Sequence, residues 1–122
     1  MRLVLDTGVF FRPQALEAAM QHDGDLVVPA VAYAERLRQV AGQGQRHVDA
    51  LRQRVRKFVE AFDADVAEIR MPALTGLDRR TWHRLARDAF IASHVRPGDE
   101  LWTTDPQDFM ALGLAAEQIV AV

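Results

Sequence analysis

The chain contains no cysteine and only one lysine among its 15 basic residues. The absence of cysteine excludes a disulfide scaffold, a thiolate metal site and a cysteine nucleophile, and it agrees with a reducing compartment. No apolar run approaches the ~20 residues that a membrane helix needs. The apolar stretch at the N-terminus is too short, and interrupted by too much charge, for a signal peptide. We therefore expect a soluble cytoplasmic protein with no membrane contact.

An excess of positive charge is also missing. The 17 acidic residues outnumber the 15 basic ones, for a formal net charge of -2. The chain therefore lacks the global positive field that dominates non-specific nucleic-acid binding, and any basic surface must be local. A length of 122 residues with 49% hydrophobic content predicts one compact domain over residues 1–122.

Several phosphate-handling motifs are absent. The chain has neither G-x-x-x-x-G-K-[ST] nor G-x-G-x-x-G, so a nucleoside triphosphate or a dinucleotide has no phosphate cradle, and no G-x-S-x-G elbow exists for a hydrolase nucleophile. A dehalogenase-type phosphotransferase needs a second Asp where Gly8 stands. A response-regulator receiver needs a late lysine, whereas the only one is Lys57, on an amphipathic helix.

Short apolar runs alternate with helical patterns along the chain. We expect strands at residues 3–5, 26–28, 64–71, 101–104 and 118–122, and helices at residues 13–21, 29–41, 45–61, 79–95 and 106–112. The expected helix at 45–61 is the clearest amphipathic one, whereas the expected strand at 64–71 is the weakest. The alternation predicts an α/β fold with a mainly parallel five-stranded sheet, covered on both faces.

Four acidic residues lie at positions where burial of the charge would cost free energy or where a ligand of an α/β sheet is expected to bind. Asp6 and Asp105 follow expected strands, Asp88 lies on an apolar helical stripe, and Glu35 lies near the middle of a helix. A buried carboxylate costs several kcal/mol unless it is paired or binds a metal. Hard oxygen ligands at the carboxyl edge of a parallel sheet suit Mg²⁺ or Mn²⁺. We therefore expect a metal site there, in which at least one carboxyl has a raised pKa.

The remaining titratable residues are expected to be unremarkable. The four histidines show no ligand spacing and are assigned to the surface or rim: His22, His47, His83 and His94. Other acidic residues are assigned to loops or polar faces, among them Glu60 and Asp99.

With these residues in view, the chain resembles a PIN domain, and most closely a VapC-type toxin of a toxin–antitoxin pair. The resemblance rests on Leu5-Asp6-Thr7, on Glu35 in a helix opened by Val28-Pro29, on Asp88-Ala89-Phe90-Ile91-Ala92, and on Thr103-Thr104-Asp105-Pro106-Gln107-Asp108-Phe109. It implies a three-layer α/β/α sandwich and metal-dependent RNA cleavage that leaves a 5′-phosphate and a 3′-hydroxyl. It also implies an antitoxin partner, a homodimer, and Mg²⁺ or Mn²⁺ held by Asp6, Glu35, Asp88 and Asp105.

Other residues are assigned supporting roles on the same basis. Thr7 and Thr103 are candidates for orienting carboxylates, and Asp108 is an auxiliary acid. Arg84 and Arg87 flank a proposed ligand and are the candidates for contacting RNA phosphates. The chain departs from the family at Gly8, where Ser or Asn is usual, and this departure affects the metal geometry.

Two alternatives from other classes remain open. A PIN-like module without catalysis would bind RNA or a protein through the same fold, and Gly8 favours this hypothesis. A metal-dependent phosphatase would turn over phosphomonoesters without cutting RNA. Metal-dependent cleavage of an RNA pool, lost in EDTA, distinguishes the nuclease from both.

Overall fold

The structure, a computed structural model, describes residues 1–122 and has five strands and six α-helices. The strands are β1 (Arg2–Leu5), β2 (Asp25–Pro29), β3 (Val59–Glu60), β4 (Glu100–Thr103) and β5 (Ile119–Ala121). The helices are α1 (Pro13–Met20), α2 (Ala30–Ala41), α3 (Gln45–Val55), α4 (Ala64–Arg70), α5 (Arg79–Ala92) and α6 (Pro106–Ala111). None of these helices combines the length and apolar character needed to cross a membrane.

The five strands form one sheet in the order β3-β2-β1-β4-β5, and every pair is parallel. Parallel pairing brings the carboxyl ends of all five strands to the same edge. The central strand β1 reads Leu3-Val4-Leu5, a continuous apolar run that is fully buried, as a strand covered on both faces must be. The predicted fold class is confirmed: an α/β, three-layer, PIN-like arrangement around a parallel five-stranded sheet.

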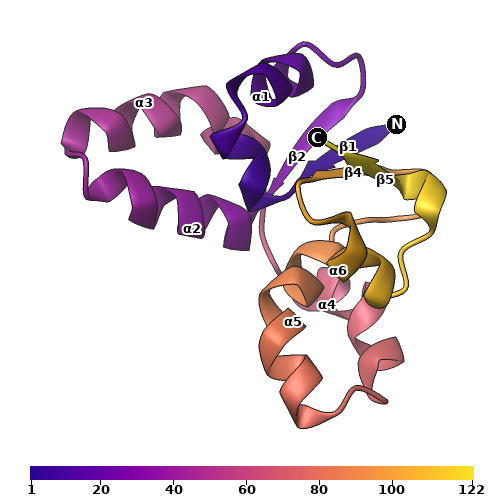
Figure 1. Cartoon of the computed structure of the whole chain (residues 1–122). Helices are drawn as coiled ribbons and strands as arrows, with labels where there is room; N and C mark the ends of the chain where they lie inside the picture. The colour runs from indigo at the N-terminus through magenta and orange to yellow at the C-terminus, as the bar shows by residue number, and fades with distance from the viewer.

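Alternate residues of β1 pack into two separate hydrophobic clusters, one on each face of the sheet. Val4 packs with α5 and α6 through residues such as Leu85 and Phe109. Leu3 and Leu5 face the other way, into a cluster that includes residues of α1 and the end of α3. Figure 1 shows α5 and α6 on one side of the sheet and α1 on the other.

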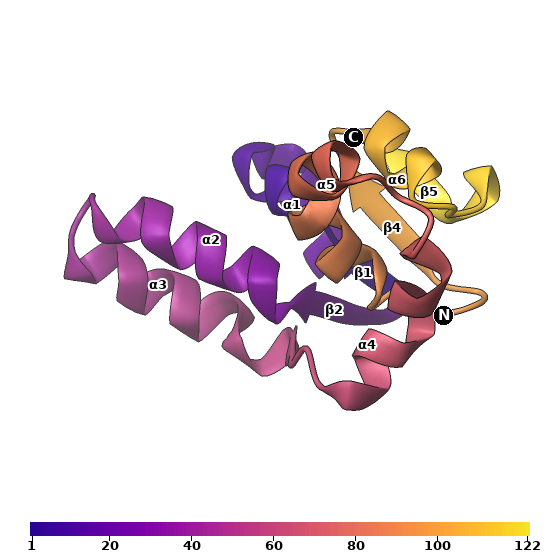
Figure 2. The same cartoon turned by 90° about the horizontal axis from the view of Figure 1, so that it is seen from below.

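Helices α2 and α3 form an antiparallel pair that extends away from the sheet (Figures 1 and 2). Gly44 joins them with a φ of 117°, a conformation that side chains with a Cβ rarely adopt. Only Val55 of α3 is fully buried, and Leu51 is half-buried. Helix α3 therefore packs mainly on α2, and only its end reaches the core, through Val55.

Two elements between residues 45 and 71 were predicted wrongly: one helix is shorter than expected, and one expected strand is a helix. The helix expected over 45–61 ends at Val55, and Val59 instead pairs with Val28 as the edge strand β3. The strand expected over 64–71 is α4, because the Asp63 carboxylate accepts a hydrogen bond from Val66 N at 2.9 Å and so caps a helix. A two-residue edge strand has too few residues to show a period in the sequence.

An ionic network that the sequence did not reveal holds this edge strand to the rest of the sheet. Glu60 Oε2 accepts from Arg2 Nη2 at 2.8 Å, and Glu60 Oε1 lies 2.7 Å from His94 Nδ1. His94 is fully buried, which corrects its assignment to the surface, and burial lowers its pKa. Asp99 is also buried and lies 3.6 Å from Arg2 Nη1. Arg2 Nη2 also donates to the backbone oxygen of His94 at 3.5 Å, in the segment that follows α5.

We predict that Glu60→Ala lowers the free energy of unfolding by about 1–3 kcal/mol, because the buried His94 loses the hydrogen-bond partner of its Nδ1 and Arg2 loses its shortest ion pair. Urea unfolding monitored by circular dichroism measures the loss. Glu117→Ala is the control, because Glu117 is exposed and has no ion pair. Equal stability of the two variants would contradict a structural role for Glu60.

Candidate functional site

Asp6 follows β1 at the carboxyl edge of the sheet and is 3% exposed. The register pairs Leu5 with Trp102, so Asp6 comes to lie beside Thr103 of β4. Asp6 Oδ2 accepts from Thr103 Oγ1 at 2.7 Å, and Asp6 Oδ1 accepts from Thr7 N at 2.8 Å. Burial raises the pKa of Asp6, and these two hydrogen bonds only partly offset the effect.

Asp88 lies in α5 among residues that pack on the sheet, including Leu85, Ala89 and Ile91. Its side chain is 5% exposed. Burial, and then the negative charge of Asp6, raise the pKa of Asp88 to about 6. Asp6, at a strand end, and Asp88, on a helix, are therefore close enough for the charge of one to act on the other.

Glu35 and Asp88 share a cation, which is the guanidinium of Arg87. Arg87 Nη1 donates to Glu35 Oε2 at 3.1 Å, and Arg87 Nε lies 3.5 Å from Asp88 Oδ1. Thr7 Oγ1 donates to Glu35 Oε1 at 3.3 Å. Contacts from η1 (Thr7–Phe11) and α5 thus join α2 to the edge of the sheet where Asp6 lies.

The other two predicted acids lie at the start of α6. Asp105 is exposed, its backbone N–H donates to Thr103 Oγ1 at 2.9 Å, and its charge contributes to the raised pKa of Asp6. Asp108 Oδ1 accepts from Arg84 Nη1 at 3.1 Å. Both arginines predicted to contact RNA are therefore paired with acidic residues of this edge in the structure.

We call Asp6, Glu35, Asp88 and Asp105 the acidic cluster. In chemistry the cluster fits a hard divalent cation, because all its donors are carboxylates and two of them are buried with raised pKa values. In geometry, no three Asp, Glu or His side chains of the chain are placed closely enough to hold a metal ion. The positive charge now held by Glu35 and Asp88 is that of Arg87.

Thr104, a residue to which the sequence analysis gave no role, lies directly beside Gly8. A Cβ added at Gly8 would overlap Thr104 Oγ1 and would lie 3.3 Å from Thr104 Cβ. The hydroxyl of Thr104 thus fills the space beside Gly8 into which the side chain of a larger residue would project. The sequence does not indicate that Thr104 occupies the space beside Gly8. The two residues are 96 positions apart and meet only because β1 pairs with β4.

Comparisons with known proteins identify the fold. No family model matches the sequence, and no curated protein matches it. Among solved structures, the chain is similar to VapBC2 from Rickettsia felis bound to a DNA fragment from their promoter, with a TM-score of 0.62 and 18% identity over 91% of this chain and 92% of that chain. It is also similar to FitAcB from Neisseria gonorrhoeae, with a TM-score of 0.61 and 20% identity over 93% of this chain and 94% of that chain.

These findings correct the family assignment made from the sequence. The identification as a PIN-domain ribonuclease of the VapC toxin type does not stand, because no family model supports it and both neighbours are complexes whose likeness does not identify the chain with the toxin component. Identities of 18 and 20% show a common fold and nothing finer. The short motifs around Asp6 and Asp88 were too brief to carry a family by themselves.

We predict that Gly8→Ala destabilises the protein by about 1–3 kcal/mol, because the new methyl group overlaps the Thr104 hydroxyl. In a Thr104→Ala background the same change should cost less than half as much, because the hydroxyl is gone. Thermal unfolding of the four proteins in this double-mutant cycle measures the coupling. An equal cost in both backgrounds would show that Thr104 does not restrict position 8.

We also predict a pH dependence of stability in EDTA that arises from Asp88. Its folded pKa of about 6 lies above the unfolded value near 4, so the folded state binds the proton more tightly and the wild type loses stability as pH rises from about 4 to 6. Asp88→Asn lacks this loss, so its stability relative to the wild type should rise by about 1–3 kcal/mol over that window. Urea unfolding at intervals from pH 4 to 7 measures it. Asp65→Asn, at an exposed residue of α4, should keep the wild-type slope.

Proposed function

We propose that this chain is an endoribonuclease that depends on Mg²⁺ or Mn²⁺. One observation carries the proposal: Asp6 and Asp88, 3% and 4% exposed, lie together at the carboxyl edge of a parallel sheet and have raised pKa values. Two buried carboxylates destabilise each other unless a cation lies between or beside them. Two buried carboxylates at the carboxyl edge of a parallel α/β sheet are typical of a site for a cation and a phosphate.

In this proposal Asp6, Glu35, Asp88 and Asp105 would hold the metal directly or through water. A bound Mg²⁺ or Mn²⁺ would supply Lewis-acid chemistry, which lowers the pKa of water and neutralises charge on phosphoryl oxygens. Thr103 and Thr7 position the carboxylates of Asp6 and Glu35 by the hydrogen bonds that they donate.

The reaction is hydrolysis of a phosphodiester by water. The water oxygen forms a bond to phosphorus, the bond from phosphorus to O3′ breaks, and O3′ takes up a proton, which leaves a 5′-phosphate and a 3′-hydroxyl. No protein nucleophile is required, in agreement with a chain that has no cysteine. Arg84 and Arg87 are both more than half exposed, and each would contact a phosphate of the RNA strand after leaving its acidic partner.

Both solved neighbours are toxin–antitoxin complexes, and one of them contains promoter DNA. Their likeness supports a place for this chain in a toxin–antitoxin system, with a protein partner of the antitoxin kind. A homodimer is also part of this proposal.

A second candidate function is a binding module without catalysis. The observation in its favour is that Arg87 already neutralises Glu35 and Asp88 and that no three carboxylates are assembled for a metal. Such a module would bind RNA or a protein without a need for a divalent cation. The same experiment distinguishes it from the nuclease.

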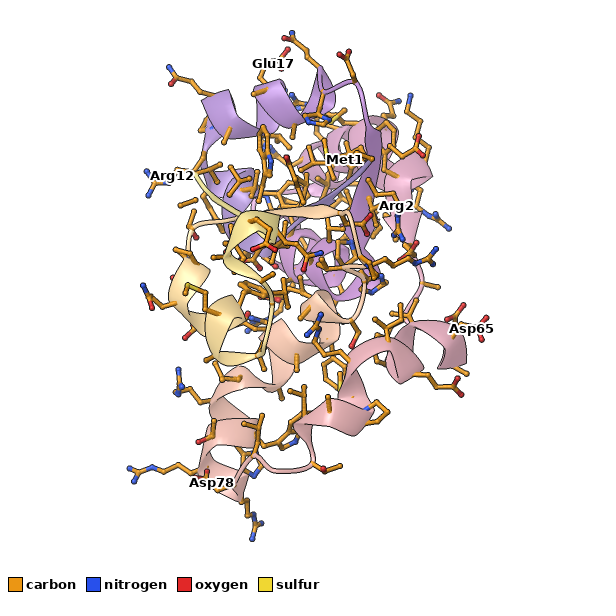
Figure 3. All side chains as sticks on the ribbon, turned by 90° about the vertical axis from the view of Figure 1, so that its right-hand side faces the viewer. Met1, Arg2, Arg12, Glu17, Asp65 and Asp78 are labelled. Atoms are coloured by element: carbon orange, nitrogen blue, oxygen red, sulfur yellow. The ribbon has the colours of Figure 1, made fainter.

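The test is cleavage of a mixed RNA pool by the purified protein in Mn²⁺ and in Mg²⁺, with EDTA as the metal-free arm. We expect Asp6→Asn and Asp88→Asn to reduce cleavage by at least about 100-fold, because each removes a charge that holds the cation. Asp65→Asn is the matched control. Figure 3 shows Asp65 at the outside of the molecule, on α4, and its loss should leave cleavage unchanged.

Gel electrophoresis of labelled RNA measures the rates, and circular dichroism checks that each variant is folded. Wild-type cleavage that resists EDTA, or undiminished cleavage by either variant, would overturn the proposal. Binding of RNA without any cleavage in either metal would favour the binding module. Turnover of small phosphomonoesters with intact RNA would indicate the phosphatase.

A further inference from the structure

We infer that Arg87 is an internal counter-ion of the acidic cluster, which a divalent cation must displace from Glu35 and Asp88 in order to bind. This inference rests on the proposed function, because it concerns the same metal. It assigns to Arg87 a positioning role that precedes any contact with RNA.

The contacts of Arg87 join carboxylates from two different elements. Arg87 is the neighbour of Asp88 on α5, and its Nε lies 3.5 Å from Asp88 Oδ1. Its Nη1 crosses to α2 and lies 3.1 Å from Glu35 Oε2. Burial raises the pKa values of Asp6 and Asp88 most, and the charge of Arg87 lowers both. One guanidinium therefore acts on three of the four acids of the cluster.

No other basic side chain of the protein performs this task. Neither Glu35 nor Asp88 has an ion pair with any residue except Arg87. Arg84, one turn earlier on α5, pairs with Asp108 instead. A cation that enters the cluster must therefore compete with Arg87, and with no other residue, for Glu35 Oε2 and Asp88 Oδ1.

The exposures of the three side chains show which of them can move. Asp88 is 5% exposed and Glu35 is 25% exposed, whereas Arg87 is 56% exposed. The guanidinium reaches the acids from the solvent side, so it can turn outward without unpacking the core. Ion pairs with a partner so exposed are weak, and a divalent cation has twice the charge with which to replace it.

No three carboxylates are placed to hold a metal ion together, and Glu35 and Asp88 pair with Arg87 instead. Glu35 is directed to Arg87 and Thr7 by hydrogen bonds to its two oxygens. Release of Arg87 frees Glu35 Oε2 and Asp88 Oδ1 at the same time. The displaced guanidinium is then available to a phosphate of the substrate.

The test is calorimetric titration of Mn²⁺ into protein freed of metal, with four proteins compared. Arg87→Ala should bind Mn²⁺ about three- to tenfold more tightly than the wild type, because the competitor is gone. Arg87→Lys should lie between the two, since an ammonium keeps the charge but cannot bridge both acids as the guanidinium does. Arg80→Ala removes an exposed charge two turns away on the same helix and should change the affinity by less than about twofold.

A second measurement separates a counter-ion from an ordinary structural ion pair. In EDTA, Arg87→Ala should melt below the wild type, because Asp88 has lost its only cationic partner. In saturating Mn²⁺ this difference should close, because the metal replaces the missing charge. A merely structural pair would lower the melting temperature equally in both conditions, and that result would overturn the inference.

The outcomes also separate this inference from the proposed function. A wild type that binds Mn²⁺ and cleaves RNA, with Arg87→Ala equal or weaker in Mn²⁺ affinity, overturns the counter-ion role alone. Equal tightening in Arg80→Ala and Arg87→Ala also overturns it, because the effect would then be one of net charge. A protein that binds Mn²⁺ in none of its variants overturns the proposed function and this inference together.

Discussion

The hydrogen bond from Thr103 Oγ1 to Asp6 Oδ2, 2.7 Å long, joins the carboxyl ends of β1 and β4, and the candidate site is arranged around it. The same threonine oxygen accepts from Asp105 N, so it also determines where the chain leaves β4. This arrangement is possible because β1 and β4 are parallel and in a register that places residues 6 and 103 side by side. A parallel sheet thereby converts two strand ends, far apart in sequence, into one polar edge.

Acidic residues lie in two different environments in this protein. Toward the carboxyl edge, the acidic residues outnumber their partners, and burial raises the pKa values of Asp6 and Asp88. Around the edge strand β3, Glu60 is surrounded by Arg2, His94 and Arg96, within 4.0 Å, and has a structural part. Acidic residues that outnumber the basic side chains around them favour binding of a cation from solution. An acidic residue with several basic partners stabilises the fold.

Much of the architecture could be predicted because its signals are local. The sequence shows the apolar runs of β1 and β2 without any tertiary contact. It also shows the prolines at the starts of three helices, Pro13, Pro29 and Pro106. The edge strand β3 could not be predicted, because two residues show no period and their pairing with β2 depends on where α3 ends. The burial of His94 was missed for a related reason, since its partner Glu60 belongs to that strand.

The sequence by itself determined the fold class and singled out Asp6 and Asp88, which are buried in the structure, because helix and strand periods and the cost of a buried charge depend on local pattern. Only the tertiary structure decided which groups meet those acids. The pairing of Arg87 with Glu35 and the filling of the space beside Gly8 by Thr104 join residues 52 and 96 positions apart. Such contacts depend on sheet register and on how α2 and α5 approach the edge, and no sequence interval specifies either.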